Sequence, residues 1–238
     1  MPRKILIIGN SDGIGRAVTR ALVARGDRVV GVSRSPSPLG TSGPRHEIQD
    51  VGSPQLGDLL RRLLREEGGK EGGKDGGFDA CIYCAGIGSG LTLPDLSNET
   101  RVFDVNLTGM VRTLETLVPH WLERGTGHFV GLSSIADDIY STDAPSYAAS
   151  KAGFSHYLLS MGLKLRRHNI AVTNIRFGFV DTKMAKAPMR PLMMTTERAA
   201  RHVLRCLDRR PLQLSVPKIV GAFAHAMRLA QSLRIWTA

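Results

Sequence analysis

Short apolar runs alternate with longer amphipathic stretches along the chain. Runs such as ILII (5–8) and GHFVGLSS (127–134) have the length of buried strands, whereas the leucines of 54–67 recur at helical spacing. This pattern predicts strands at 5–8, 27–35, 46–51, 78–86, 127–134, 170–178 and 212–216. It predicts helices between the first strand and residue 26, and at 54–67, 97–125, 146–168, 195–210 and 218–235.

The alternation of strands and helices predicts the fold class. Strands separated by helices pair in parallel, and the helices cover both faces of the sheet. We therefore expect an α/β fold: a Rossmann-type, doubly wound parallel sheet with three αβα layers, forming a single domain over residues 1–238. The low-complexity, Gly/Lys-rich segment 66–77 is expected to be a flexible surface loop within that domain. Such sheets bind ligands at the carboxyl ends of their strands, where the strand order reverses.

The composition limits the cellular compartments and the kinds of binding partner that we expect for this protein. The apolar run after MPRK is too short for a signal peptide and no stretch is long enough for a membrane span, so we expect a cytoplasmic protein. A formal net charge of +11 is compatible with anionic partners such as phosphate-bearing cofactors, although a solvated arginine-rich surface is the preferred explanation. Cys81 and Cys84 lie in a predicted buried strand, where cysteine acts as a small apolar residue, and we expect no metal site.

The segment GNSDGIG follows the first predicted strand and carries Gly9, Gly13 and Gly15. Glycines at such positions permit a tight turn, let a phosphate approach the backbone and let the helix pack closely on the strand. The N-terminus of that helix offers free N–H groups to a pyrophosphate. A tight turn without a ligand is the alternative, but its place in a βαβ unit favours a dinucleotide site.

The end of the second predicted strand, VGVSRS, indicates the type of cofactor. An acidic residue there would bind the adenosine ribose and repel a 2′-phosphate, and none is present. Arg34 can pair with that phosphate and Ser33 can hydrogen-bond it, which favours NADP(H) over NAD(H). Asp12 in the glycine turn would oppose the phosphate, and Arg34 could instead be a solvated surface residue.

Tyr147 and Lys151 are four residues apart in the helix predicted at 146–168, so their side chains lie on one face. A free phenol has a pKa near 10, which is too high for proton transfer near neutral pH. A nearby ammonium stabilises the phenolate and lowers this pKa. The pair therefore has the chemistry of a general acid–base tyrosine, although this spacing is mostly structural when it occurs alone.

Taken in order, these motifs resemble the short-chain dehydrogenase/reductase family over about residues 5–184. Besides GNSDGIG, the resemblance rests on YCAG (83–86), VNLTG (105–109), GLSS (131–134), YAASK (147–151) and RFGFVDTKM (176–184). It implies an NAD(P)(H)-dependent oxidoreductase that interconverts a carbonyl and an alcohol by hydride transfer, with reduction by NADPH favoured.

The resemblance also implies roles for individual residues. Tyr147 would be the acid/base, Lys151 would bind the nicotinamide ribose, Ser134 would hydrogen-bond the substrate oxygen, and Asn106 would hold a water that links Lys151 to solvent. Thr182 would hold the nicotinamide carboxamide. The implied cofactor-binding residues are Gly9, Ser11, Asp12, Gly13, Ile14, Gly15, Ser33, Arg34, Asp50, Val51, Cys84, Ala85, Gly86, Tyr147, Lys151, Gly178, Val180 and Thr182.

Structural alternatives exist for three of these residues: Ser134 could cap a strand end and leave Ser133 as the functional serine, Asn106 could brace the backbone, and Thr182 could be a helix N-cap. The sequence also departs from the family pattern. Tyr83 and Cys84 replace the two asparagines of an N-N-A-G segment, and Phe177 replaces the proline of a P-G turn. All four catalytic positions keep their expected residue types.

The sequence specifies the partners less closely. A methionine-rich segment near 183–197 is expected to be a lid over an apolar carbonyl or alcohol substrate, which could be linked to a carrier; simple packing of these methionines is an equal alternative. The resemblance implies a homodimer or homotetramer. The basic C-terminal helix at 218–235 could lie on a membrane surface, but packing on the core or on another subunit is preferred. A non-catalytic NADP(H) sensor and an anionic-surface binder are the alternative functions, and no nucleic acid is expected because few aromatic residues lie among the dispersed basic ones.

Overall fold

The computed structural model describes residues 2–36, 39–40, 43–68, 76–88, 90–185 and 192–236. Its centre is one parallel sheet with the strand order β3-β2-β1-β4-β5-β6-β7. The strands are β1 (Lys4–Ile8), β2 (Arg28–Ser33), β3 (Arg45–Ile48), β4 (Ala80–Tyr83), β5 (Gly127–Ser134), β6 (Ile170–Phe177) and β7 (Gln213–Val216). The predicted doubly wound α/β fold is confirmed.

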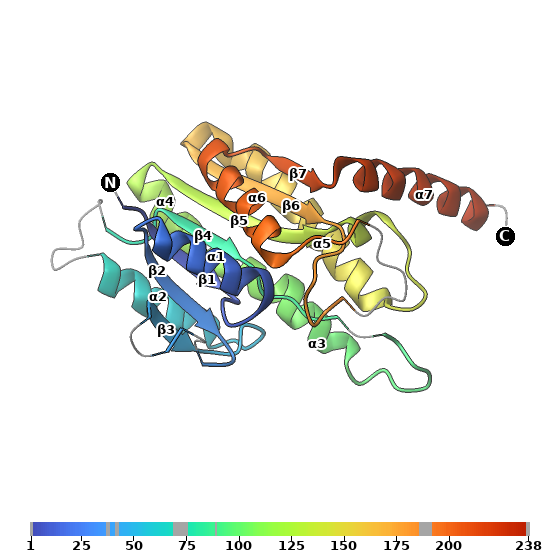
Figure 1. Cartoon of the computed structure of the whole chain (residues 1–238), viewed down its shortest axis with the longest axis horizontal. Helices are drawn as coiled ribbons and strands as arrows, with labels where there is room; N and C mark the ends of the chain where they lie inside the picture. Colours follow the sequence, from blue (N-terminus) through green and yellow to red (C-terminus); the bar gives the residue numbers. More distant parts are fainter. Residues whose placement is uncertain are drawn as a thin grey trace.

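Helices cover both faces of the sheet (Figure 1). They are α1 (Gly13–Ala24), α2 (Leu56–Glu67), α3 (Glu99–Phe103), α4 (Gly109–Arg124), α5 (Pro145–Leu165), α6 (Thr196–Arg209) and α7 (Lys218–Trp236). Apolar side chains of α1 and α6 form one core with one face of the sheet, and those of α2, α4 and α5 form a second core with the other face. Two apolar faces buried on one sheet are the main source of stability in such a fold.

The two cysteines of the C-x-x-C sequence belong to different cores. Cys81 is buried in the core with α2, α4 and α5, whereas Cys84 packs against the core with α1 and α6. Burial raises the pKa of both thiols. Both cysteines therefore act as small apolar residues on opposite sides of the sheet, as the sequence predicts.

The helix predicted over 97–125 is interrupted by a π-helical turn, η1 (Asp104–Thr108), between α3 and α4. Such turns are frequent at functional sites because they displace a side chain from the regular helical ladder. Asn106 lies in this turn and is fully buried. The interruption therefore coincides with one of the predicted catalytic positions.

Two predicted loops fall partly outside the described residues. In the segment 66–77, residues 69–75 lie outside them, and the N–H of Gly77 donates to the carbonyl of Glu67 at 3.1 Å. In the predicted lid 183–197, residues 186–191, including Met189, lie outside them. The N–H of Asp181 donates to the carbonyl of Met194 at 2.9 Å, so backbone bonds hold the two ends of this segment together.

Helix α7 extends from the end of the sheet formed by β7 and projects away from the body of the protein (Figure 1). It contacts β7 and a short 3-10 helix, η2 (Ile135–Asp138), that follows β5. Packing of α7 on the rest of the protein is thus limited to one side of the helix. None of the helices in the described part of the chain is both long and apolar enough to cross a membrane.

The close packing of α1 on β1 is directly testable. A Cβ at Gly15 would lie 2.0 Å from the carbonyl oxygen of Gly9, so Gly15→Ala is expected to lower the free energy of unfolding by more than about 1 kcal/mol in urea denaturation. The matched control is Gly57→Ala in α2, where the nearest atom to a new Cβ is Nη1 of Arg61 at 3.4 Å. The free energy of unfolding of Gly57→Ala is expected to equal that of the natural chain or to exceed it by about 0.5–1 kcal/mol. Equal effects of the two substitutions would contradict the packing described here.

Candidate active site

The glycine turn lies at the carboxyl end of β1, beside the segment that follows β4. Gly9 has φ +87°, and a Cβ there would lie 2.5 Å from the backbone nitrogen of Ala85. Only glycine permits this approach of two backbones. Because β1 and β4 are neighbours at the point where the strand order reverses, the turn opens into the crevice that binds ligands in such sheets. Gly13, with φ +50°, and the N-terminus of α1 form a cradle that fits a pyrophosphate.

Asp12 has a structural role in this turn. Its carboxylate caps α1 by accepting a hydrogen bond from the N–H of Gly13 at 2.8 Å, and it pairs with Nζ of Lys183 at 2.8 Å. The hydrogen bond from Lys183 is the main cause that lowers the pKa of Asp12, so the carboxylate is ionised and neutralised locally. The sequence does not predict this pairing, because Lys183 lies in the segment after β6.

The end of the crevice that is predicted to hold the adenosine is formed by the ends of β2 and β3. The hydroxyl of Ser33 donates to the carbonyl of Ser35 at 2.8 Å and orders the turn that carries Arg34, whose side chain is exposed. Arg101 of α3 forms an ion pair with Asp50 at 2.5 Å, and its hydrogen bond is the main cause that lowers the pKa of Asp50. Arg34 lowers that pKa further through its charge. Two arginines therefore face Asp50, and Arg101 was not predicted from the sequence.

Tyr147, Ser134 and the backbone near Gly88 meet at the carboxyl ends of β4 and β5. Ser134 is the last residue of β5, and its hydroxyl lies near the phenol of Tyr147, whose pKa it lowers. A Cβ at Gly88 would lie 2.9 Å from Cδ2 of Tyr147, so the phenol ring lies against this backbone. Ser133 is instead buried between α5 and the sheet, where its hydroxyl forms a hydrogen bond with that of Ser155 at 2.8 Å. The geometry therefore brings Ser134, and not Ser133, to the tyrosine.

Lys151 is buried one helical turn after Tyr147. Its Nζ donates to the carbonyl of Leu132 at 2.9 Å and lies 4.9 Å from the centre of the Phe154 ring. Burial lowers the pKa of Lys151 to about 8, and the charge of Asp137 opposes this shift. The ammonium is 6.0 Å from the centre of the Tyr147 ring.

The pKa of Tyr147 differs from the expectation drawn from the sequence. The pKa is raised, because burial is the largest effect and exceeds the lowering by the nearby Ser134 hydroxyl; the charge of Asp137 raises it further. Lys151 is not among the causes of the shift. In this state of the protein the ammonium interacts with Leu132 and Phe154, and the expected lowering of the phenol pKa is absent.

Asn106 connects the π-helical turn with the segment after β4. Its Oδ1 accepts from the N–H of Ile87 at 2.8 Å, and its Nδ2 donates to the carbonyl of Ile87 at 2.9 Å and to Ser150 at 3.0 Å. A Cβ at Gly86 would lie 3.5 Å from both Asn106 Oδ1 and Lys151 Nζ. The asparagine therefore braces the backbone, which was the alternative weighed above, and it also lies beside the lysine.

The nicotinamide end was predicted to involve the residues after β6. Phe177 ends β6 as a buried residue, and the N–H of Gly178 donates to the carbonyl of Val216 at 2.8 Å. Val180 is buried and bridges to Met194. Thr182 lies over the glycine turn, because a Cβ at Gly13 would be 3.2 Å from its methyl group. These predicted residues thus converge with Gly13 on one crevice.

A buried ion-pair network lies directly behind this site. Arg176 of β6 makes a bidentate pair with Asp137, with Nη2 2.6 Å from Oδ1, and it also pairs with Asp138. Ser155 of α5 donates a hydrogen bond to Asp137. Burial is the largest effect on the pKa of Asp137 and raises it. Only the tertiary contacts of this aspartate identify it as a charge that acts on Tyr147 and Lys151.

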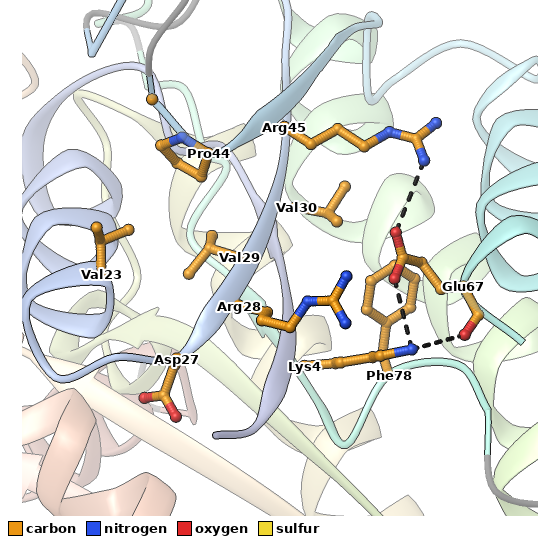
Figure 2. Close-up of a pocket in the computed structure, with 11 residues that line it drawn as sticks. Lys4, Val23, Asp27, Arg28, Val29, Val30, Pro44, Arg45, Glu67 and Phe78 are labelled. Atoms are coloured by element: carbon orange, nitrogen blue, oxygen red, sulfur yellow. Dashed lines mark hydrogen bonds and ion pairs between the residues drawn. The ribbon is translucent and has the colours of Figure 1, made fainter. Parts of the chain in front are cut away.

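A separate hollow, shown in Figure 2, lies at the amino ends of the strands. It has a cavity volume of about 380 Å³, and its lining includes Lys4, Arg28 and Arg45, the first residues of β1, β2 and β3. Glu67 accepts a hydrogen bond from Lys4 at 2.8 Å through its backbone carbonyl. This hollow is at the edge of the sheet opposite to the glycine turn. The described residues contain no group of three or more His, Cys, Asp or Glu arranged to hold a metal ion.

The buried ammonium predicts a pH-dependent stability. The pKa of Lys151 is about 8 in the folded protein and 10.5 ordinarily, so the cost of burying its charge is fully present below pH 8 and disappears as the pH rises to about 10.5. Lys151→Met is therefore expected to raise the free energy of unfolding relative to the natural chain by about 1–3 kcal/mol at pH 7, and by less at pH 10. Urea denaturation at both pH values measures this difference. A difference that does not change with pH would contradict burial of the charge.

Comparisons with known proteins agree with this geometry. The family model described as "short chain dehydrogenase" matches residues 65–191. An uncharacterized oxidoreductase of Myxococcus xanthus is 31% identical over 232 residues, covering 90% of this chain and 87% of that protein. A 3-oxoacyl-(acyl-carrier-protein) reductase of Vibrio cholerae is 26% identical over 191 residues, covering 76% of this chain and 75% of that protein.

Solved structures show the same fold. A short-chain dehydrogenase of Burkholderia cenocepacia in complex with NADP superposes with a TM-score of 0.81 at 20% identity, covering 98% of this chain and 97% of that one. A short-chain dehydrogenase of Streptomyces avermitilis gives 0.80 at 19% identity, with 100% and 96% covered. With the ordered motifs, the parallel sheet and the family match together, the chain belongs to the short-chain dehydrogenase/reductase family and is an oxidoreductase that interconverts a carbonyl and an alcohol with a nicotinamide cofactor.

Proposed function

We propose that this protein is an NADPH-dependent carbonyl reductase in which Tyr147 donates the proton. The observation that carries the proposal is the proximity of the Ser134 hydroxyl to the Tyr147 phenol, with the buried Lys151 one turn further along α5. These groups lie at the carboxyl end of the sheet, in the crevice that the glycine turn also faces.

The proposed chemistry follows from the positions of these groups. The cofactor supplies a hydride to the carbonyl carbon, and the developing charge on the carbonyl oxygen needs hydrogen-bond donors and a proton. Ser134 donates a hydrogen bond to that oxygen, and the Tyr147 phenol transfers its proton to it. A raised pKa keeps the phenol protonated in the resting enzyme, which suits a group that acts as an acid in the direction of reduction.

Lys151 supports this proton transfer and positions the cofactor. With a pKa of about 8, its ammonium and amine are both accessible near neutral pH, so it can pass a proton toward the tyrosine after turnover. Its Nζ can exchange the carbonyl of Leu132 for the hydroxyls of the nicotinamide ribose. Asn106, adjacent to Lys151 and anchored on Ile87, is placed to hold the water that connects the lysine with solvent.

NADP(H) is favoured because cations dominate the adenosine end of the crevice. Arg34 is exposed at the end of β2, and Arg101 lies beside it on Asp50. Asp12, the residue that opposes a 2′-phosphate, is neutralised by Lys183. Structures with the same fold include complexes with NADP, which supports the same choice here.

The proposed substrate is a 3-oxoacyl thioester, which could be carried on an acidic carrier protein. Relatives that reduce such groups, by name, are 25–26% identical over about three quarters of the chain. Met184, which is 3.8 Å from a Cβ built at Gly86, provides apolar surface near the site. The net charge of +11 complements an acidic carrier. A homodimer or homotetramer that uses α4 and α5 stays a prediction.

A substitution that removes the phenol oxygen of Tyr147 tests whether this residue is the proton donor. Tyr147→Phe is expected to keep NADPH affinity and to lose at least about 100-fold in turnover of acetoacetyl-coenzyme A, because the proton donor is gone. The matched control is Tyr157→Phe on the same helix, which is expected to retain turnover. Unchanged turnover in Tyr147→Phe would refute the mechanism, and absence of turnover by the natural chain would refute the thioester substrate.

A second substitution tests the cofactor preference. Arg34→Ala is expected to weaken NADPH binding about 10–100-fold and to leave NADH binding nearly unchanged, because only NADPH carries the 2′-phosphate. Titrations followed by nicotinamide fluorescence measure both affinities. The control is Arg25→Ala, because Arg25 lies at the C-terminal end of α1, opposite to the end that follows the glycine turn. Equal losses for the two cofactors would mean that Arg34 does not contact the phosphate.

A further inference from the structure

Helix α7 is attached to the body along one side only. The carboxylate of Asp138 lies 3.6 Å from Arg228, and the Gln231 amide exchanges two hydrogen bonds with the backbone of Tyr140, at 2.9 and 3.0 Å. Gly221 packs so closely on β7 that a Cβ would lie 2.8 Å from Cβ of Ser215. These contacts fix the orientation of the helix, and therefore which of its side chains face outward.

The outward side of α7 is apolar. Ile219 is 71% exposed and Phe223 is 65% exposed. Residues 219, 223, 226, 230 and 233 are Ile, Phe, Ala, Ala and Leu, and their spacing of four, three, four and three places them on one face. The remaining large apolar side chains that are exposed on α7 are those of Met227, Leu229, Ile235 and Trp236. So many large apolar groups on one exposed helix indicate an interaction surface.

The charge of α7 distinguishes between possible partners. Residues 218–238 contain no aspartate or glutamate, and Lys218 at the start of the helix is exposed, whereas Arg228 pairs with Asp138 on the side that faces the body. If the partner were a second copy of α7, cations would face cations without an acidic residue from either helix. An anionic lipid surface complements both properties at once, because it accepts the apolar face among its acyl chains and the cations at its headgroups.

We propose that α7 is a membrane-docking helix that lies in the plane of an anionic lipid surface, with Ile219 and Phe223 among its inserted side chains. At 19 residues, it presents an apolar face about 28 Å long. The opposite side of α7 contacts η2, which follows the strand end that carries Ser134. Docking would thus place α7 between η2 and the lipid surface. The proposal does not depend on which substrate is reduced.

Vesicle binding by the full chain tests the proposal. Vesicles of equal parts phosphatidylcholine and phosphatidylglycerol are expected to co-sediment the protein, and those of phosphatidylcholine alone are expected to bind it more weakly, with added salt weakening the anionic case. The chain has two tryptophans, Trp121, which is fully buried, and Trp236, which is 89% exposed. A shift of tryptophan emission to shorter wavelength on binding would therefore report on the end of α7.

Substitutions on α7 and on another part of the surface test whether α7 makes the contact with lipid. Ile219→Ser combined with Phe223→Ser is expected to lower vesicle partitioning at least about tenfold, since both side chains leave water on binding. Leu163→Ser on α5 is the matched control, because Leu163 is 66% exposed and lies outside α7. Its partitioning is expected to stay unchanged, and circular dichroism checks that all variants are folded.

Three results would overturn the proposal. Protein that stays in the supernatant with anionic vesicles would show that α7 does not dock on lipid. Equal loss of binding in the Leu163→Ser control would place the lipid contact elsewhere. An oligomer that dissociates in the Ile219→Ser/Phe223→Ser variant, without vesicle binding by the natural chain, would assign this face to a second copy.

Discussion

The buried ammonium of Lys151 is the constraint around which the site is organised. A charge removed from water needs compensation, and the protein supplies it with the carbonyl of Leu132 at 2.9 Å, the ring of Phe154 at 4.9 Å and the charge of Asp137. Compensation is incomplete, because the pKa of the lysine still falls to about 8. A lysine held in this way can exchange its internal partners for a ligand, since its charge gains from any added hydrogen-bond acceptor.

The parallel sheet makes this arrangement possible. Strand ends that are far apart in sequence meet at one edge, so Ser134 of β5, the segment after β4 and the glycine turn after β1 share one crevice. Close backbone contacts at Gly9 and Gly15 leave no room for side chains there. The network of Arg176 with Asp137 then joins β6 to η2 and α5 behind the crevice, and it adds a negative charge that acts on both Tyr147 and Lys151.

The sequence predicted the regular elements and most positions at the site, because both depend on local patterns. Apolar runs set the strands, and short motifs set the glycine turn and the Tyr147–Lys151 spacing. It did not predict the ion pairs of Asp50 with Arg101 and of Asp137 with Arg176, since their partners are 51 and 39 residues apart and no periodicity links them. The predicted direction of the shift in the Tyr147 pKa was also wrong for the free protein, because burial is a tertiary property that the helical spacing does not encode.

The most direct test of the account is a titration of the Tyr147 phenol in the presence and absence of NADP⁺. The protein has four tyrosines, so carbon-13 labelling of the phenol ring and comparison with Tyr147→Phe identify its signal by nuclear magnetic resonance. The account predicts a pKa above the ordinary value of 10.0 in the free protein, and a lower pKa once the positively charged nicotinamide ring is bound. A phenol whose pKa is insensitive to NADP⁺ would contradict the claim that Tyr147 is the acid of this site.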